Sequence, residues 1–136
     1  MNEDSLYIHS FLMHKDIPFL RYFHAPCHSS GEWLKAVKKL NIQACAVVSC
    51  MSKDDKAVMN LHPVGKSDEG FKDLPLLTPF SLILGEEGKI SLRIPESLCQ
   101  SERLCFPCAD ARESVVISSA DFMERFIPEA HISIAH

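Results

Sequence analysis

Two apolar runs joined by a short polar segment form the most regular part of the hydrophobic pattern. The runs are Ala44–Met51 and Ala57–Leu61, and the segment Ser52–Lys56 lies between them. Short apolar runs bounded by turn residues are typical of strands, and the linker has the length of a hairpin connection. The first run lacks polar alternation, which predicts a strand near the centre of a sheet, covered on both faces. Cys45 and Ser49 would lie on the same face of this strand.

The N-terminal segment predicts a helix followed by a strand. Asp4 or Ser5 can cap this helix, and the residue before Pro18 avoids helical geometry and ends it. Its buried face follows the i, i+3, i+4 spacing of apolar residues, namely Ile8, Phe11 and Leu12. Phe19–Phe23 then predicts a strand, and a loop begins at His24.

A capping-box pattern, Ser29 followed by Glu32, predicts the start of a second helix. Its apolar stripe consists of Trp33, Val37 and Leu40. Three lysines lie largely off this stripe, namely Lys35, Lys38 and Lys39. Lysines on a short helix usually form a solvated face, and the functional alternative is a local phosphate contact.

The second half of the chain predicts short strands and one final helix. The expected strands are Pro79–Leu84, Lys89–Ile94, Leu104–Cys108, Ser114–Ile117 and an edge strand at His131–Ile134. The first two would form a hairpin, and Pro95–Glu102 would be a short helical or looped connection. The final helix would be capped by Ser118 or Ser119 and ended by Pro128, with a buried face of Phe122, Met123 and Phe126.

This order of elements predicts one α+β domain over residues 1–136, with a mixed, mostly antiparallel sheet flanked by helices. The expected core includes Phe11, Trp33, Val37, Val47, Phe106, Val115 and Phe122. A length of 136 residues, with 46% hydrophobic and 24% charged residues, suits one soluble domain. The net charge of −4 does not favour DNA binding, so any phosphate contact would need a local basic patch.

The N-terminal residues lack the basic start and apolar core of a signal peptide, and no apolar run has the length of a membrane span. We therefore expect a cytoplasmic protein that does not associate with membranes. Six cysteines would then be reduced thiols.

Metal binding and nucleophilic catalysis are two alternatives for the cysteines. His24, Cys27 and His28 together with Cys105 and Cys108 have the spacing of a tetrahedral zinc site. Side chains three positions apart on a strand point to opposite faces, which favours thiols without metal. A Cys–His catalytic pair is a weaker hypothesis, because six cysteines and seven histidines make chance pairing common. We expect no metal and no cofactor.

The ordered set of segments resembles the YbaK/prolyl-tRNA-deacylase-like family over nearly the whole chain. No single motif is highly specific, and the resemblance rests on their order. The matching segments are Ile8–Leu12, Ile17–Phe19, Tyr22–His24, Glu32, Ala44–Val48, Pro79–Ser81, Arg103–Ser118 and Ser119–Phe126.

This resemblance implies hydrolysis, without metal, of the ester in mischarged aminoacyl-tRNA. Family members act in trans or as inserted domains of a synthetase. The implied partners are the acceptor end of aminoacyl-tRNA and an aminoacyl-tRNA synthetase. The chemistry needs a pocket sized for the wrong amino acid and donors that hold the carbonyl or the water. The residues implied to line the pocket are His24, Cys45, Ser49, Phe80, Ser81, Ala109 and Asp110.

The chain departs from the family pattern at several positions. Cys45 is at the position where the family has a lysine, and Ala109 is at the position of a family glycine. The aspartate of the family falls near Ile94. The short stretch Val64–Thr78 replaces a middle helix and a glycine-rich loop. A missing lysine removes a charged contact, and alanine for glycine narrows the approach to the backbone. These departures predict weakened or lost deacylation, and the alternative is a non-catalytic adaptor that binds tRNA or a synthetase. A zinc-stabilised binding domain is a third hypothesis.

Overall fold

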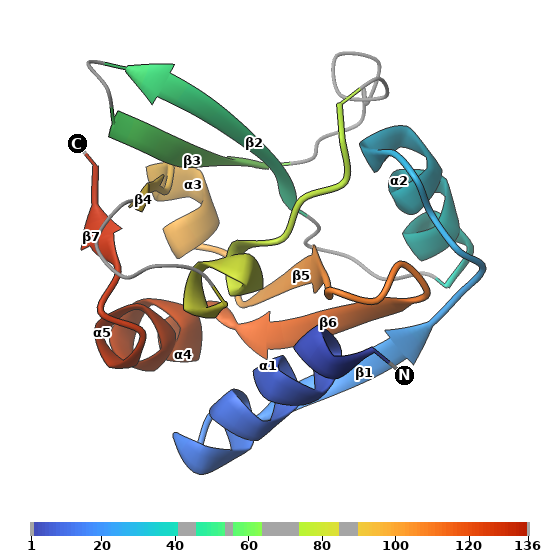
Figure 1. The fold of residues 1–136 in the computed structure, drawn as a ribbon, viewed down its shortest axis with the longest axis horizontal. Coiled ribbons are helices and arrows are strands. Elements are labelled where there is room, and N and C mark those ends of the chain that lie inside the picture. Colours follow the sequence, from blue (N-terminus) through green and yellow to red (C-terminus); the bar gives the residue numbers. More distant parts are fainter. Residues whose placement is uncertain (1, 41–45, 54–55, 64–73, 85–89, 136) are drawn as a thin grey trace.

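The structure, a computed structural model, describes residues 2–40, 46–53, 56–63, 74–84 and 90–135 (Figure 1). It contains helices and strands in the α+β arrangement expected from the sequence. In chain order the elements are α1 (Glu3–His14), β1 (Phe19–Phe23), α2 (Ser30–Lys39), β2 (Ala46–Lys53), β3 (Lys56–Pro63), η2 (Pro79–Ile83), β4 (Ile90–Arg93), α3 (Glu96–Cys99), β5 (Arg103–Pro107), β6 (Glu113–Ser118), α4 (Ser119–Asp121), η3 (Phe122–Phe126), α5 (Ile127–Glu129) and β7 (Ser133–Ile134).

The described strands form two sheets instead of one central sheet. The three-stranded sheet has the order β1-β6-β5 and is antiparallel throughout. The four-stranded sheet has the order β2-β3-β4-β7, in which β2 and β3 are antiparallel and the other neighbours are parallel. In Figure 1 the β2–β3 hairpin and α1 lie at opposite ends of the molecule.

Helices cover both faces of the three-stranded sheet. Cys105 and Val116, paired across β5 and β6, pack with Trp33 of α2. Phe106 and Val115, the next pair, face the larger core. That core contains Ile8 and Leu12 of α1 and Phe80, Phe122 and Phe126 from the second half of the chain. Successive side chains of β5 and β6 point to opposite faces of the sheet, so each residue packs either against α2 or in the larger core.

The predicted core is largely confirmed. The buried members are Trp33, Val37, Phe106, Val115 and Phe122. Phe11 is half-buried and packs edge-on against Phe126. The side chain of Val47 lies outside the part of the chain that the structure describes.

The prediction that Ala44–Met51 lies at the centre of a sheet is wrong. Among the described strands, β2 is at the edge of its sheet and pairs with β3 alone. Ala46 and Val48 are buried, whereas Cys50 is exposed. β2 also contacts β5, and Ala46 and Val48 pack in the larger core, so burial of one face accounts for the apolar character of this segment.

The prediction of a strand at Pro79–Leu84 is also wrong, because η2 is a 3₁₀ helix. The Thr78 hydroxyl caps it by accepting a hydrogen bond from the Phe80 N–H at 3.2 Å. Pro79 suits the first position of the helix. An N–H at this position would have no acceptor within the helix, so the lack of an N–H in proline costs no hydrogen bond. This turn directs Phe80 into the core, where its ring lies edge-on to Phe106 and Phe126.

Without a strand at that position, the predicted hairpin with Lys89–Ile94 does not form. Ile90–Arg93 is a strand, but it pairs in parallel with β3 on one side and β7 on the other. The predicted strands Leu104–Cys108 and Ser114–Ile117 correspond to β5 and β6, and the edge strand near His131 is β7.

Helix boundaries follow the capping patterns with two corrections. Ser29 and Ser118 cap their helices, as predicted, by accepting hydrogen bonds from the N–H groups of Glu32 and Asp121. The first helix is instead capped by Asn2, whose side chain accepts from the Ser5 N–H at 2.7 Å.

Pro128 does not end the last helix, which runs through α4, η3 and α5 to Glu129. The segment η3, which ends two residues before Pro128, is π-helical. Its wider turn changes the hydrogen-bond spacing at the position where Pro128 has no N–H to donate.

Candidate functional site

A loop after β1 presents three polar side chains, those of His24, Cys27 and His28. The backbone holds this loop against the β5–β6 turn. The His24 N–H donates to the Arg112 carbonyl at 2.9 Å, and the Cys27 N–H donates to the Ala111 carbonyl at 3.1 Å. The position of His24 is therefore fixed by the sheet and not by its own loop alone.

The imidazole of His24 is part of a chain of hydrogen bonds. Its Nδ1 lies 3.0 Å from the Ala25 carbonyl oxygen, which only accepts, so Nδ1 carries the proton. Its Nε2 lies 2.8 Å from the Ser114 hydroxyl oxygen and accepts from it. The same oxygen receives the indole N–H of Trp33 at 2.8 Å. Both ring nitrogens of His24 thus have partners, so in this arrangement neither nitrogen is free to act as a base.

The Cys27 thiol lies beside this ring, with its sulfur 3.3 Å from the Ala25 carbonyl oxygen and 3.6 Å from Nδ1 of His24. Burial raises the pKa of the Cys27 thiol, and the negative charge of Glu32 raises it further. A thiol held in its neutral form is a poor nucleophile and a poor metal ligand. The predicted Cys–His catalytic pair is therefore not supported here.

Between this loop and α2 lies a cavity of about 450 Å³. Its lining includes His24, which we predicted as a site residue, and two of the three predicted phosphate contacts, Lys35 and Lys39. The other lining residues are Ala25, Pro26, Cys27, His28, Glu32, Ala36 and Leu40. Lys38 lies on the same helix but does not line the cavity.

Lys35 and Lys39 are one helical turn apart and project from the same side of α2. Within the described residues neither ammonium group forms an ion pair or a hydrogen bond. Glu32, one turn before Lys35, also lines the cavity, and its carboxylate accepts the His28 N–H at 2.6 Å. The cavity therefore combines two ammonium groups and an imidazole with one carboxylate, and the side formed by Lys35 and Lys39 suits an anionic ligand.

The other predicted residues that the structure describes do not line this cavity. Ser49 lies on β2, where its hydroxyl is 2.6 Å from Nε2 of His62. Phe80 is fully buried in the core, and the Ser81 hydroxyl donates to the Thr78 carbonyl at 2.8 Å. Cys45 lies outside the described residues.

Ala109 and Asp110 belong to the turn between β5 and β6. The Asp110 N–H donates to the Ser5 hydroxyl at 2.8 Å. Its carboxylate accepts the Arg112 N–H at 2.9 Å, and this backbone hydrogen bond, with a second from the guanidinium, lowers the pKa of Asp110. Asp110 therefore stabilises its own turn.

A buried polar network that the sequence analysis missed lies under α1. Nε2 of His9 is 2.6 Å from Oε2 of Glu113, and the Arg21 guanidinium lies 2.6 Å from Oε1. Glu113 and His9 are 2% and 7% exposed, so this carboxylate is almost fully desolvated. The signal available in the sequence was a charged residue at the start of an otherwise apolar strand, Glu113–Ser118.

This network also contains the one group of possible metal ligands found among the described residues, namely His9, Cys108 and Glu113. Both oxygens of Glu113 already have hydrogen-bond partners. Burial raises the pKa of the Cys108 thiol to about 11. His9, Cys108 and Glu113 therefore form a buried hydrogen-bonded cluster in which the carboxylate oxygens are already used. The hypothesised zinc site is also not assembled, because Cys105 and Cys108 pack on opposite sides of the sheet.

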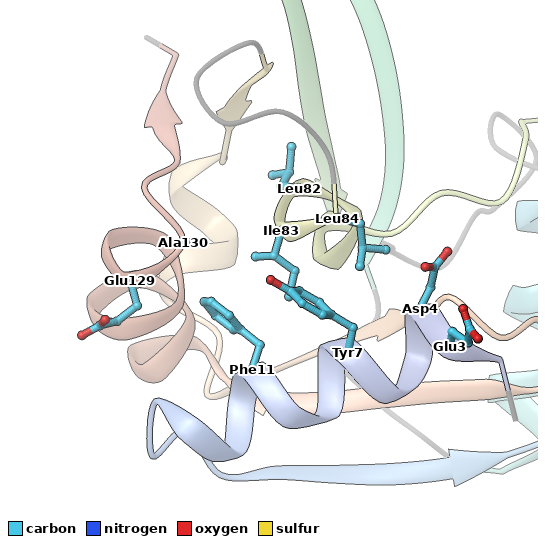
Figure 2. A pocket seen from close by; sticks show the side chains of 9 residues that line it. All are labelled: Glu3, Asp4, Tyr7, Phe11, Leu82, Ile83, Leu84, Glu129 and Ala130. Atoms are coloured by element: carbon cyan, nitrogen blue, oxygen red, sulfur yellow. The ribbon is translucent and has the colours of Figure 1, made fainter.

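A second cavity, of about 550 Å³, lies between α1 and η2 (Figure 2). Figure 2 shows the rings of Tyr7 and Phe11 facing the aliphatic side chains of η2 and its C-terminal end. The acidic group at one end, Glu129, already pairs with Lys15 at 3.2 Å. Of the predicted site residues that lie in the described ranges, none lines this cavity.

No helix among the described residues has the length and apolar character needed to cross a membrane.

Comparison with known proteins supports the fold and nothing further. No family model matches the chain, and no curated protein matches it. A solved structure described as "Epitope backbone grafting by computational design for improved presentation of linear epitopes on scaffold proteins" is similar, with a TM-score of 0.56 and 11% sequence identity. The similarity covers 99% of this chain and 96% of that chain.

Proposed function

We propose that this protein binds the acceptor end of aminoacyl-tRNA and hydrolyses its aminoacyl ester weakly or not at all. The observation that supports this proposal is the cavity beside α2, where the uncommitted ammonium groups of Lys35 and Lys39 lie with His24. Two cations one turn apart suit the successive phosphates of a single strand. The resemblance to the YbaK-like deacylases is what selects tRNA among ligands with phosphates.

The site geometry favours binding of the aminoacyl-tRNA acceptor end with little hydrolysis of its ester. Both nitrogens of the His24 ring are occupied, by Ala25 and Ser114. The Cys27 thiol is held neutral by burial, which raises its pKa. An adaptor that presents the acceptor end to a synthetase therefore remains the second candidate.

Binding to a mischarged tRNA should depend on Lys35 and Lys39. We expect the Lys35→Gln/Lys39→Gln double variant to weaken binding, measured by gel shift across a salt series. Each lost phosphate contact should lower the slope of log K against log salt by about 1. Lys38→Gln is the control, because it removes one positive charge from the same helix without altering the cavity lining, whereas the double variant removes two from the lining.

A deacylation assay over a panel of mischarged tRNAs separates the two candidates. Slow hydrolysis that disappears with the double variant supports the deacylase, and binding without hydrolysis supports the adaptor. The proposal is wrong if the native protein neither shifts nor deacylates any tRNA, or if Lys38→Gln weakens binding as much as the double variant.

A further inference from the structure

The β2–β3–β4 sheet packs on the core with one face, and several polar side chains project from the other face. Ala46 and Val48 on β2, Met59 and Leu61 on β3, and Leu92 on β4 are buried in the core. Because side chains alternate along a strand, the intervening residues project from the opposite face. The described ones include Ser49, Asn60, His62 and Arg93.

Pairing register brings these four residues together. Asn60 is directly opposite Ser49 in the antiparallel pair and directly beside Arg93 in the parallel pair. His62 pairs with Val47 and is therefore the diagonal neighbour of Ser49. Directly opposite side chains have Cβ atoms about 4.5–5.5 Å apart, which is within reach of a common small ligand.

The Ser49 hydroxyl and the His62 imidazole form a short hydrogen bond, with Oγ 2.6 Å from Nε2. Burial lowers the pKa of His62, so the ring is neutral at neutral pH and Nε2 is able to accept the hydroxyl proton. Both side chains are half-buried, which leaves the pair open to solvent. This is the geometry by which a base activates a serine nucleophile.

Groups that could stabilise a negative oxygen lie next to the pair. The Asn60 carboxamide is half-buried and makes no hydrogen bond to the described residues. Arg93 lies on the neighbouring strand, directly beside Asn60 in the register. An amide donor and a cation beside a nucleophile are the components of an oxyanion site.

We infer that Ser49 and His62 form a nucleophile and general-base pair that hydrolyses small acyl esters. Ser49 Oγ forms a bond to the carbonyl carbon while its proton passes to His62 Nε2. The ester C–O bond then breaks, and the departing alcohol takes this proton. Water attacks the acyl-serine, His62 accepts the water proton and returns it to Oγ, and a carboxylic acid leaves. Asn60 and Arg93 stabilise the oxyanion in both steps.

This activity is separate from the proposed function, since it requires neither tRNA nor any residue that lines the cavity beside α2. The probes are a biotinylated fluorophosphonate, which labels activated serines, and p-nitrophenyl acetate as substrate. We expect one adduct per chain by intact mass, and peptide mapping of the native protein should place it on Ser49.

Variants give the kinetic test. Ser49→Ala should abolish labelling and reduce ester hydrolysis to the background, and His62→Gln should lower the rate by about 10²–10⁴-fold. Asn60→Ala should lower the rate of hydrolysis while leaving the short Ser49–His62 contact in place. Ser81→Ala, which removes another half-buried hydroxyl, is the matched control and should change neither measurement.

The pH dependence tests the base directly. His62 must be neutral to accept a proton, and burial lowers its pKa from the ordinary value of 6.5. The acid limb of the rate should therefore have its midpoint below 6.5. The inference is overturned if the folded native protein is not labelled, if the adduct maps to another residue, or if hydrolysis persists unchanged in Ser49→Ala.

Discussion

Each of the two sheets has a strand residue in a 2.6 Å hydrogen bond with a histidine, but the surroundings of the two pairs differ. Under α1, His9 meets Glu113, whose other oxygen is held by Arg21. On the outer face of the four-stranded sheet, His62 meets Ser49. Glu113 is 2% exposed, whereas both Ser49 and His62 are half-buried.

The difference shows how burial decides what a polar pair contributes. A desolvated carboxylate with all its partners in place is costly to disrupt and cannot meet a substrate. A half-exposed pair adds little to folding but keeps one side open to a ligand. The first pair is therefore structural, and the second is available for chemistry.

The largest effect that tests this comparison is expected from Glu113→Ala. Removing the carboxylate leaves His9 buried without its partner, and breaking a buried pair costs about 3–5 kcal/mol. Urea unfolding should show this loss in the free energy of unfolding. Glu129→Ala removes one partner of the exposed Lys15 pair and should cost under about 1 kcal/mol. Equal losses in the two variants would contradict the comparison.

An intermediate effect is expected from Trp33→Phe. This change removes the indole N–H that donates to Ser114, whose hydroxyl is fully buried. A buried group that loses a partner costs about 1–3 kcal/mol. A double-mutant cycle with Ser114→Ala, followed by urea unfolding, separates the hydrogen bond from the loss of ring volume. A coupling energy near zero would show that the bond does not stabilise the fold.

The smallest effect is expected from Ser49→Ala. A single hydrogen bond between half-exposed groups contributes about 0.5–1.5 kcal/mol, so the free energy of unfolding should fall by no more than this. The same urea titrations provide the measurement. A loss as large as that of Glu113→Ala would place Ser49 among the structural residues and remove the contrast between the sheets.

Features encoded by neighbouring residues could be predicted from the sequence. Three kinds of feature depend on residues that are close in sequence. They are the helix caps at Ser29 and Ser118, the strand Phe19–Phe23 and the β2–β3 hairpin. Lys35 and Lys39 could likewise be expected on one side of a helix. The sequence could not predict that His24 lines the same cavity as these lysines. The position of the His24 loop depends on contacts with the distant β5–β6 turn.

The errors arose where tertiary packing outweighed a local pattern. Pro79–Leu84 has the composition of a strand, but the Thr78 cap and Pro79 begin a helical turn that buries Phe80. The apolar start of β2 reflects packing on β5 and not a second strand partner. His9 and Glu113 are 104 positions apart, so no local pattern could have paired them.

The strand pairing has a consequence for the order of folding. Among the described strands, only the β2–β3 and β5–β6 pairs join strands that are close in sequence, whereas β1, β4 and β7 pair with distant segments. Closing a long loop costs entropy before its contacts form, so distant pairings are slow. The two hairpins can form early and act as templates. β1 then pairs with β6 of the β5–β6 hairpin, and β4 and β7 extend the β2–β3 hairpin, so both sheets are completed in the last stage of folding.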